Sequence, residues 1–182
     1  MKIWREGIIT TVLVMISVIG FSQARSSIGF GVGVNKTFSD GYRFGHGFNL
    51  QGSIRVGNAF AIVPTIGYER LNAEYAVVHE GFSSYTRSSI DLIGVGFSGK
   101  YYFKEQWFAR AGVLLHLGGG NEGLSAGGFG GTFAAGYDMP LDNRNDLEFT
   151  LRTDVVNFSQ GSTGFVPVVG LRVAYNFNFR PL

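Results

Sequence analysis

Three histidines are the side chains in this sequence best suited to acid–base chemistry: His46, His79 and His116. Acyl transfer or hydrolysis needs a nucleophile and a base, held in place by a third polar group. Ser125 follows His116 across a predicted hairpin, and Asp154 would lie at a similar height. No motif spacing supports this trio, and the scattered histidines do not have the spacing of metal ligands. We therefore expect neither catalysis nor a metal site, and interpret His116 as one more polar interior residue.

The composition excludes other kinds of chemistry. There is no cysteine, which rules out disulfides, thiol catalysis and lipid attachment through an N-terminal cysteine. The glycine runs "GVGV", "GGG" and "GGFGG" precede no predicted helix, so they are not phosphate-binding loops. A net charge of +2 with no basic run gives no electrostatic footprint for nucleic acid. We expect no cofactor and no nucleic-acid partner.

Charged residues of both signs form a second candidate group. Counted by strand alternation, nine of them would point into a narrow barrel: Arg55, Glu69, Lys100, Arg110, Asp138, Glu148, Arg152, Asp154 and Arg172. Buried charges must be paired or solvated, so these residues predict an ion-pair belt across the middle of the lumen. The belt would be either a plug or a gate, and the plug is favoured because eight-stranded lumens are normally filled.

The predicted strand register brings some of these charges together. A hairpin centred near Ser162 would place Arg152 opposite Arg172, and a tight turn at "KEQ" would place Lys100 opposite Arg110. Ala134 is small and would leave room for Arg110 to reach toward Arg152. We expect these pairings to be accurate to about two residues.

The elements that would position these charges are strands. In "GFVPVVGLRVAYNFNF" every second residue from Phe165 to Phe179 is large and apolar, which is the pattern of a strand with one face in an apolar medium. After residue 24 no segment shows an apolar pattern of helical period and length. Eight alternating segments are predicted: Ile28–Phe38, Phe48–Val56, Phe60–Tyr75, Ile90–Phe103, Trp107–Leu117, Gly127–Met139, Leu147–Phe158 and Phe165–Phe179.

Short and long connections roughly alternate between these segments. "GN" and "KEQ" predict tight turns, whereas "VVHEGFSSYTRSS" predicts the longest loop. "PLDNRND" breaks the alternation because it is no shorter than the loop after it. Short turns at one end and long loops at the other are typical of an up-and-down membrane barrel. An even strand count would place both termini at the short-turn end.

Three features indicate that the apolar face meets lipid and not a protein core. The polar face carries small residues and few charges, which suits the crowded interior of a narrow barrel better than a soluble surface. All eight segments reach the roughly 9 to 11 residues that a tilted spanning strand needs. Aromatic residues gather at the strand ends near the tight turns, around an aliphatic middle. This predicted aromatic girdle comprises Phe60, Tyr101, Phe103, Trp107, Tyr137, Phe149, Tyr175, Phe177 and Phe179.

The first 24 residues have the pattern of a secretory signal. Lys2 and Arg5 precede an apolar run from Ile8 to Phe21, and Ser22-Gln23-Ala24 supplies small residues for a signal peptidase. The run is shorter than the roughly 20 residues of a spanning helix, although a retained anchor is the alternative. We predict a signal peptide over residues 1–24 and one exported barrel domain over residues 25–182.

On these patterns the chain resembles the small eight-stranded outer-membrane barrels, the OmpA/OmpX-type transmembrane domain and the "porin family" barrels of diderm bacteria. Its last strand, "YNFNF", resembles the aromatic terminal strand that the barrel assembly machinery recognises, although Arg180, Pro181 and Leu182 follow it. The resemblance implies insertion in the outer membrane, contact with its lipid, assembly by that machinery and a monomeric state.

We therefore predict an all-β, eight-stranded antiparallel transmembrane barrel, non-enzymatic, with a structural or surface-interaction role. An extracellular partner would contact the longest loop through His79, Glu80, Phe82, Tyr85 and Arg87. Three alternatives remain: a small passive porin or narrow ion channel, an outer-membrane lipid-modifying enzyme, and a soluble lipocalin-like periplasmic binder. In the last of these, the apolar stripe would line a ligand cavity.

Overall fold

The computed structural model describes residues 26–38, 42–79, 82–120, 125–158 and 164–179. Within these ranges the side chains of residues 42, 73–79, 82–88, 120, 125–126, 157–158 and 164–165 are not described. The predicted signal peptide lies outside the described residues, as does Glu80. No helix in the described ranges is long and apolar enough to cross a membrane.

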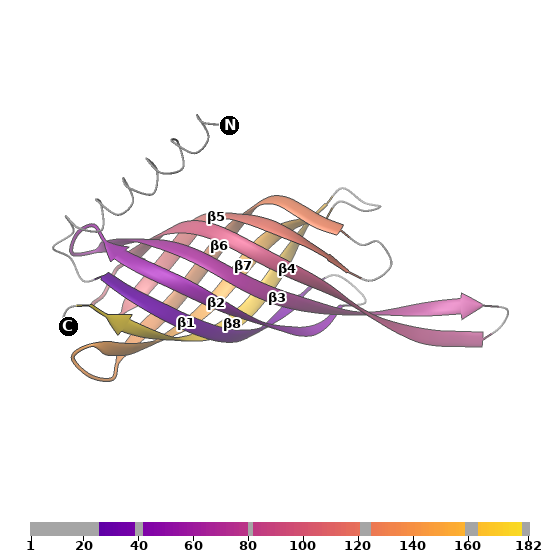
Figure 1. Ribbon diagram of the computed structural model, residues 1–182, viewed down its shortest axis with the longest axis horizontal. Helices are drawn as coiled ribbons and strands as arrows, with labels where there is room; N and C mark the ends of the chain where they lie inside the picture. The colour runs from indigo at the N-terminus through magenta and orange to yellow at the C-terminus, as the bar shows by residue number, and fades with distance from the viewer. Residues whose placement is uncertain (1–25, 39–41, 80–81, 121–124, 159–163, 180–182) are drawn as a thin grey trace, which may run out of the picture.

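Eight antiparallel strands form one closed barrel in sequence order, and β1 pairs with β8 to complete it. Figure 1 shows the tilted strands wound around a single axis. This confirms the predicted fold class and strand number. The strands are β1 Ser26–Thr37, β2 Tyr42–Arg55, β3 Phe60–His79, β4 Phe82–Tyr102, β5 Trp107–Gly120, β6 Ser125–Pro140, β7 Asn145–Phe158 and β8 Gly164–Asn178.

The largest departure from the predicted strand limits is at β3 and β4. The segment predicted as the longest loop is instead a regular hairpin, paired without interruption as far as His79↔Phe82. It projects well beyond the other strands (Figure 1). β2 also begins earlier than predicted, at Tyr42, with an irregularity between Arg43 and His46. We call this projecting β3–β4 hairpin the ribbon. It was predicted as a loop because its polar residues lack the apolar alternation of a lipid-facing strand.

The two ends of the barrel differ. Three connections, residues 56–59, 103–106 and 141–144, lie at the end that also carries Ser26 and Asn178, which we call the turn end. The opposite end, from which the β3–β4 hairpin projects, is the ribbon end (Figure 1). "PLDNRND" is a tight turn, since β6 continues to Pro140 and β7 begins at Asn145. Asp142 holds this turn by accepting hydrogen bonds from the backbone N–H groups of Arg144 and Asn145, at 2.7 and 2.8 Å.

The outward face of the barrel is apolar and the inward face is polar. Along β1, Ile28, Phe30, Val32 and Val34 are each about half exposed, whereas Asn35 is buried. The other strands show the same arrangement, with polar side chains inside and apolar ones outside. Asn49, Lys100 and Arg152, for example, are buried in the lumen. A soluble protein would leave this apolar band in water, whereas lipid covers it at no cost. The barrel is therefore a transmembrane one, and the lipocalin-like alternative is wrong.

Pro64 lies within the spanning part of β3, where a proline removes one backbone N–H donor from the ladder. No bulge is present, because the β3–β4 register continues unchanged through Pro64↔Phe97. The β2–β3 ladder instead skips from Gln51↔Thr65 to Ile54↔Ile62, and Gly52 stands opposite the proline. A Cβ on Gly52 would come within 3.3 Å of the Pro64 ring, so the glycine gives the ring room. The barrel accommodates the missing N–H donor by this local gap in pairing.

The predicted girdle residues lie on the outer face toward the turn end. Trp107 is 49% exposed and packs edge-on against Tyr137, with the ring centroids 5.1 Å apart. Phe177 and Phe179 pack similarly at 6.0 Å. The band between the two ends is not purely aliphatic, because Phe97 and Phe133 are exposed near its middle. The remaining girdle residues of the outer face are Phe60, Tyr101, Phe103, Phe149 and Tyr175.

Candidate functional site: the charged interior of the barrel

Toward the turn end, four of the predicted belt residues form one group, the turn-end cluster: Lys100, Arg110, Asp138 and Glu148. Lys100 Nζ on β4 donates to Asp138 Oδ2 on β6 and to Glu148 Oε2 on β7, both at 2.8 Å. The side chain of Lys100 is 2% exposed. Arg110 Nη1 lies 3.7 Å from Glu148 Oε1, too far for a hydrogen bond. The four charges sum to zero, which makes their burial tolerable.

Aromatic and hydroxyl groups complete this cluster. Lys100 Nζ lies 3.8 Å from the centroid of the Phe108 ring, within cation–π range. The Tyr102 hydroxyl donates to Asp138 Oδ2 at 2.9 Å, and the Thr150 hydroxyl donates to Glu148 Oε1 at 2.9 Å. Phe108 fits here because its inward neighbour on β6 is Gly136, where a Cβ would lie 2.4 Å from Phe108 Cζ. The Lys100 ammonium is thus held on several sides.

Nearer the ribbon end lies a second neutral group, the ribbon-end cluster: Glu69, Arg152, Asp154 and Arg172. Glu69 Oε1 on β3 pairs with Arg172 Nη2 at 3.0 Å and also with Arg152. Arg152 Nη2 pairs in turn with Asp154 Oδ2 at 2.9 Å. Asn35 donates to the second oxygen of Glu69 at 3.3 Å. One carboxylate from β3 therefore joins two arginines from the opposite wall of the lumen.

The structure divides the nine predicted belt residues into these two clusters, with Arg55 apart. The guanidinium of Arg55 lies 4.4 Å from the Tyr102 ring centroid, near the mouth at the turn end. Lys100 is opposite Arg110, and Ala134 lies between Arg110 and Arg152 on neighbouring strands. The predicted Arg152–Arg172 register is wrong by two residues, because Arg152 is opposite Gly170 and Arg172 is opposite Thr150. The hairpin is therefore centred one residue earlier than expected.

An apolar layer that sequence reasoning missed closes the lumen on the ribbon side of these charges. We call it the apolar septum, and its side chains are 1–2% exposed: Leu71, Ile90, Leu92, Val156 and Val168. All five occupy inward positions of their strands. The same alternation that marked the charged residues could have found them.

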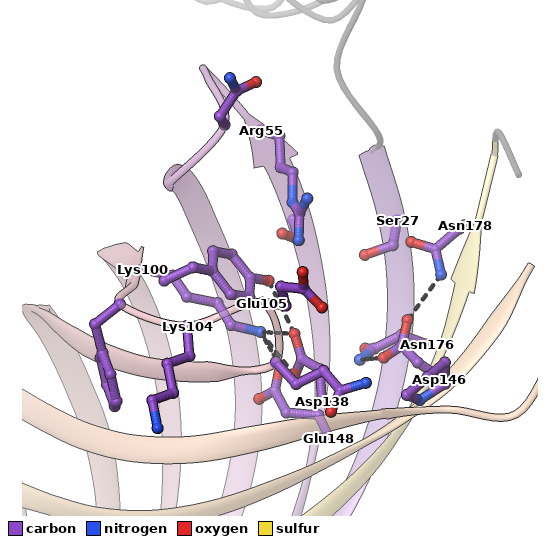
Figure 2. A pocket seen from close by; sticks show the side chains of 16 residues that line it. Ser27, Arg55, Lys100, Lys104, Glu105, Asp138, Asp146, Glu148, Asn176 and Asn178 are labelled. Atoms are coloured by element: carbon purple, nitrogen blue, oxygen red, sulfur yellow. Dashed lines mark hydrogen bonds and ion pairs between the residues drawn. The ribbon is translucent and has the colours of Figure 1, made fainter. Parts of the chain in front are cut away.

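At the turn end the lumen opens into a polar cavity of about 550 Å³ (Figure 2). Lys100, Asp138 and Glu148 of the turn-end cluster line its floor, and Figure 2 shows the Lys100 ammonium joined to both carboxylates. On one wall Asp146 accepts hydrogen bonds from Asn176 and Asn178, both at 2.7 Å. The lumen is thus a vestibule open at the turn end, blocked first by ion pairs and then by the septum.

Of the trio His116, Ser125 and Asp154, which the sequence did not favour as a catalytic site, the structure describes the side chains of His116 and Asp154. His116 and Asp154 both line a void of about 20 Å³, enough for one water molecule and too small for an acyl chain. His116 is buried opposite Gly128, whose φ of 133° suits glycine and lies beside a register irregularity in β6. Ser125 pairs with Gly119, but its side chain is outside the described residues. His46 is exposed on the outer face of β2 and is not near His116.

Four of the five predicted surface-contact residues lie on the projecting hairpin and not in a loop. His79 ends β3, whereas Phe82, Tyr85 and Arg87 belong to β4, opposite His79, Ala76 and Glu74 respectively. Their side chains are not described. In the described residues no group of three or more His, Cys, Asp or Glu side chains could hold a metal ion.

Solved structures similar to this chain are small membrane barrels. Neisserial surface protein A aligns with a TM-score of 0.59 at 15% identity, covering 85% of this chain and 97% of that one. The fold is that of the small eight-stranded outer-membrane barrels. The attachment invasion locus protein Ail of Yersinia pestis, in complex with the heparin analogue sucrose octasulfate, aligns with a TM-score of 0.56 at 15% identity, covering 85% and 98%.

A third similar structure, outer membrane protein AlkL in DMPC lipid bilayers, has a TM-score of 0.56 at 15% identity and covers 88% of this chain and 92% of that one. No protein-family model matches the sequence, and no curated protein matches it. At identities this low, the TM-scores show a shared fold. That fold agrees with the lipid-facing band, which the exposed apolar residues of this chain define independently.

Proposed function

We propose that this chain is an integral outer-membrane protein that uses a closed barrel to anchor the β3–β4 ribbon beyond the membrane, where the ribbon contacts an extracellular partner. The observation that carries this proposal is the continuation of β3 and β4 past their neighbours. β2 stops pairing with β3 at Tyr42↔Ala73, and β5 stops pairing with β4 at Ile90↔Gly120. Beyond these pairs the ribbon continues to His79↔Phe82.

The backbone of the ribbon is suited to strand addition. In the described part of the chain, no strand pairs with the outer edge of β3 after Ala73 or of β4 before Ile90. Each edge therefore presents N–H and C=O groups that an extended segment of a partner can pair with. His79, Phe82, Tyr85 and Arg87 would then supply side-chain selectivity along the ribbon; the fifth residue of this predicted set, Glu80, lies outside the described residues.

The closed lumen supports an anchoring role over a pore. Two charge-neutral clusters and the apolar septum lie in series along the barrel, and eight-stranded lumens are normally filled by side chains. A non-enzymatic role accords with the small void beside His116. Lipid contact follows from the exposed apolar band, whereas recognition by the assembly machinery through the last strand and a monomeric state remain part of the proposal.

Two neighbours support the location and the class of function. One is named a surface protein and another an attachment invasion locus protein, and both have this fold. β1 begins and β8 ends at the turn end (Figure 1), which is the periplasmic end in barrels of this kind. The ribbon would then point away from the cell.

The first experiment compares boiled and unboiled outer-membrane fractions on an SDS gel. A closed membrane barrel stays folded in SDS until heated, so we expect a heat-dependent shift in migration. The second experiment removes residues 75–86 and joins Glu74 to Arg87 through Asn-Gly, a two-residue turn that suits a hairpin. Cells displaying the shortened chain should keep the gel shift but lose adhesion to immobilised proteins and glycans that the full chain binds.

A matched control alters the ribbon without shortening it. In this control, Glu80→Gln keeps the length and both backbone edges, so binding that depends on strand addition should persist. Equal adhesion of the full and shortened chains would overturn the ribbon's role. Absence of a gel shift in the outer-membrane fraction would overturn the location.

A further inference from the structure

The void of about 20 Å³ beside His116 lies in the lumen, among the residues of the ribbon-end cluster and against Leu92 of the apolar septum. Its walls come from β2, β3, β4, β5, β7 and β8, so most of the barrel surrounds it. A water molecule needs roughly 10 to 15 Å³ of such space, so the void holds one small molecule. The ionisable side chains around it are all buried: Glu69, His116, Arg152, Asp154 and Arg172.

Three of these side chains carry a buried polar atom that no described residue satisfies. The atoms are Asp154 Oδ1, His116 Nε2 and Arg172 Nε. The other oxygen of Asp154 already pairs with Arg152. The Nη2 group of Arg172 already pairs with Glu69. Buried polar groups nearly always have a hydrogen-bond partner, either in the protein or in ordered water, so these three atoms point to a ligand in the void.

The packing of the His116 ring directs its unpartnered nitrogen into the lumen. The ring lies between two glycines of the neighbouring strands, Gly94 on β4 and Gly130 on β6. A Cβ on Gly94 would lie 3.4 Å from Nδ1 and 3.6 Å from Cε1, and a Cβ on Gly130 would lie 3.6 Å from Cδ2. These ring atoms face the wall, so Nε2, at the tip of the ring between Cε1 and Cδ2, points toward the void.

The charges around the void decide what kind of ligand it takes. Glu69 and Asp154 carry two negative charges, and Arg152 and Arg172 carry two positive ones, so the lining is neutral. An ion of either sign would add an uncompensated charge to a buried site. A water molecule adds none. It can accept from Arg172 Nε, donate to Asp154 Oδ1 and form a third hydrogen bond with His116 Nε2 in either tautomer of the ring, and three hydrogen bonds are typical of a buried water.

We infer that the lumen binds one water molecule in this void, held by Asp154 Oδ1, His116 Nε2 and Arg172 Nε. The water connects His116 on β5 to the ribbon-end cluster on β7 and β8, and it is part of the closed lumen. His116 is then a structural residue that holds this water. The inference rests on the lumen alone and is independent of the ribbon and of any partner that the ribbon contacts.

A high-resolution crystal structure of the barrel purified from the outer membrane tests this inference directly. Crystals grown in sodium bromide and in rubidium chloride separate a water from an ion, because bromide and rubidium scatter anomalously. We expect one density peak within hydrogen-bond distance of the three atoms, without anomalous signal in either salt. An anomalous peak would show an ion at the site, and either that result or the absence of any peak would overturn the inference.

Gly94→Ala and Gly94→Ser test what the water contributes to stability. Gly94 lines the void, and a Cβ there would make only ordinary van der Waals contacts, so both side chains fit. The alanine methyl group takes the space of the water but forms no hydrogen bond, whereas the serine hydroxyl can donate and accept in its place. Gly94→Ala should therefore raise the unfolding equilibrium constant about tenfold over that of Gly94→Ser, measured by urea unfolding in lipid vesicles.

The matched control is the pair Gly57→Ala and Gly57→Ser, because Gly57 is exposed in a turn and a Cβ there would meet no atom within 4 Å. These two variants should unfold at the same urea concentration, and all four variants should keep the heat-dependent gel shift. Equal unfolding midpoints for Gly94→Ala and Gly94→Ser would overturn the role of the water. If a Gly94 variant fails to insert, the crystal structure of the unaltered chain still decides the inference.

Discussion

Glu69 on β3 and Arg172 on β8 meet at 3.0 Å across the lumen, although their strands share no edge and their positions are 103 residues apart. Only closure of the sheet brings them together. Glu69 also binds Arg152 on β7, so one carboxylate ties three separate parts of the barrel wall. Such cross-lumen pairs add to the backbone ladder in specifying how the barrel closes.

Glu148→Gln should destabilise the barrel strongly. The change leaves Lys100 with a single carboxylate and removes the charge facing Arg110, and both cations are buried. Breaking a buried pair by removing one partner costs about 3–5 kcal/mol. Urea unfolding in lipid vesicles measures the loss. Glu105→Gln is the control, since Glu105 is exposed in a turn; equal unfolding midpoints for both variants would contradict a structural role for the cluster.

Arg152→Ala should leave conductance across a planar bilayer near the baseline. The apolar septum remains in place beyond the cluster, with Leu92 and Val156 still buried in the lumen. Adding Leu92→Ala and Val156→Ala opens that layer, so the triple variant should conduct measurably more. If Arg152→Ala alone opened the lumen fully, the ion pairs would be a gate and the septum no barrier.

Asp142→Ala should lower stability at neutral pH and lose this effect in acid. Hydrogen bonds from the Asn145 side chain and from the backbone N–H of Arg144 and Asn145 hold the pKa of Asp142 below its ordinary 3.8. A lowered folded-state pKa contributes stability above the unfolded pKa and loses it as pH falls through the folded one. The difference between the variant and the parent should therefore be constant above pH 3.8 and shrink below it. Asn143→Ala, in the same exposed turn, should show no such pH dependence.

Cleavage after Ala24 should leave Trp107 as the only tryptophan, since the other is Trp4. Intact mass spectrometry of the outer-membrane form should match residues 25–182.

Trp107 is half exposed on the outer face beside Tyr137, at the predicted lipid interface. Brominated lipids with labels near the headgroup should quench its fluorescence more than lipids labelled near the acyl terminus. Equal quenching, or a mass that includes Trp4, would contradict this assignment.

Much of the fold could be predicted because the alternation of residue types within each strand shows which face meets lipid and which faces the lumen. Alternation of Leu171, Val173 and Tyr175 with Arg172 and Ala174 shows which side chains face lipid. The β3–β4 ribbon escaped prediction because beyond Ala73 neither face meets lipid or a core, so no apolar alternation is needed there. The predicted register between β7 and β8 was wrong by two residues, because the sequence of residues 159–163 offers several possible centres for the turn.

The sequence by itself determined the strand number, the inversion of polar and apolar faces, and most of the inward charges, because each depends on residues two apart in one strand; the inward Asp146 was missed because it was assigned to a loop. The tertiary structure alone decided that Lys100 meets Asp138 and Glu148, that Glu69 meets Arg152 and Arg172, and that five apolar side chains seal the ribbon end. These contacts cross the lumen between distant strands. Their geometry depends on the register and tilt at which the barrel closes, which no single strand encodes.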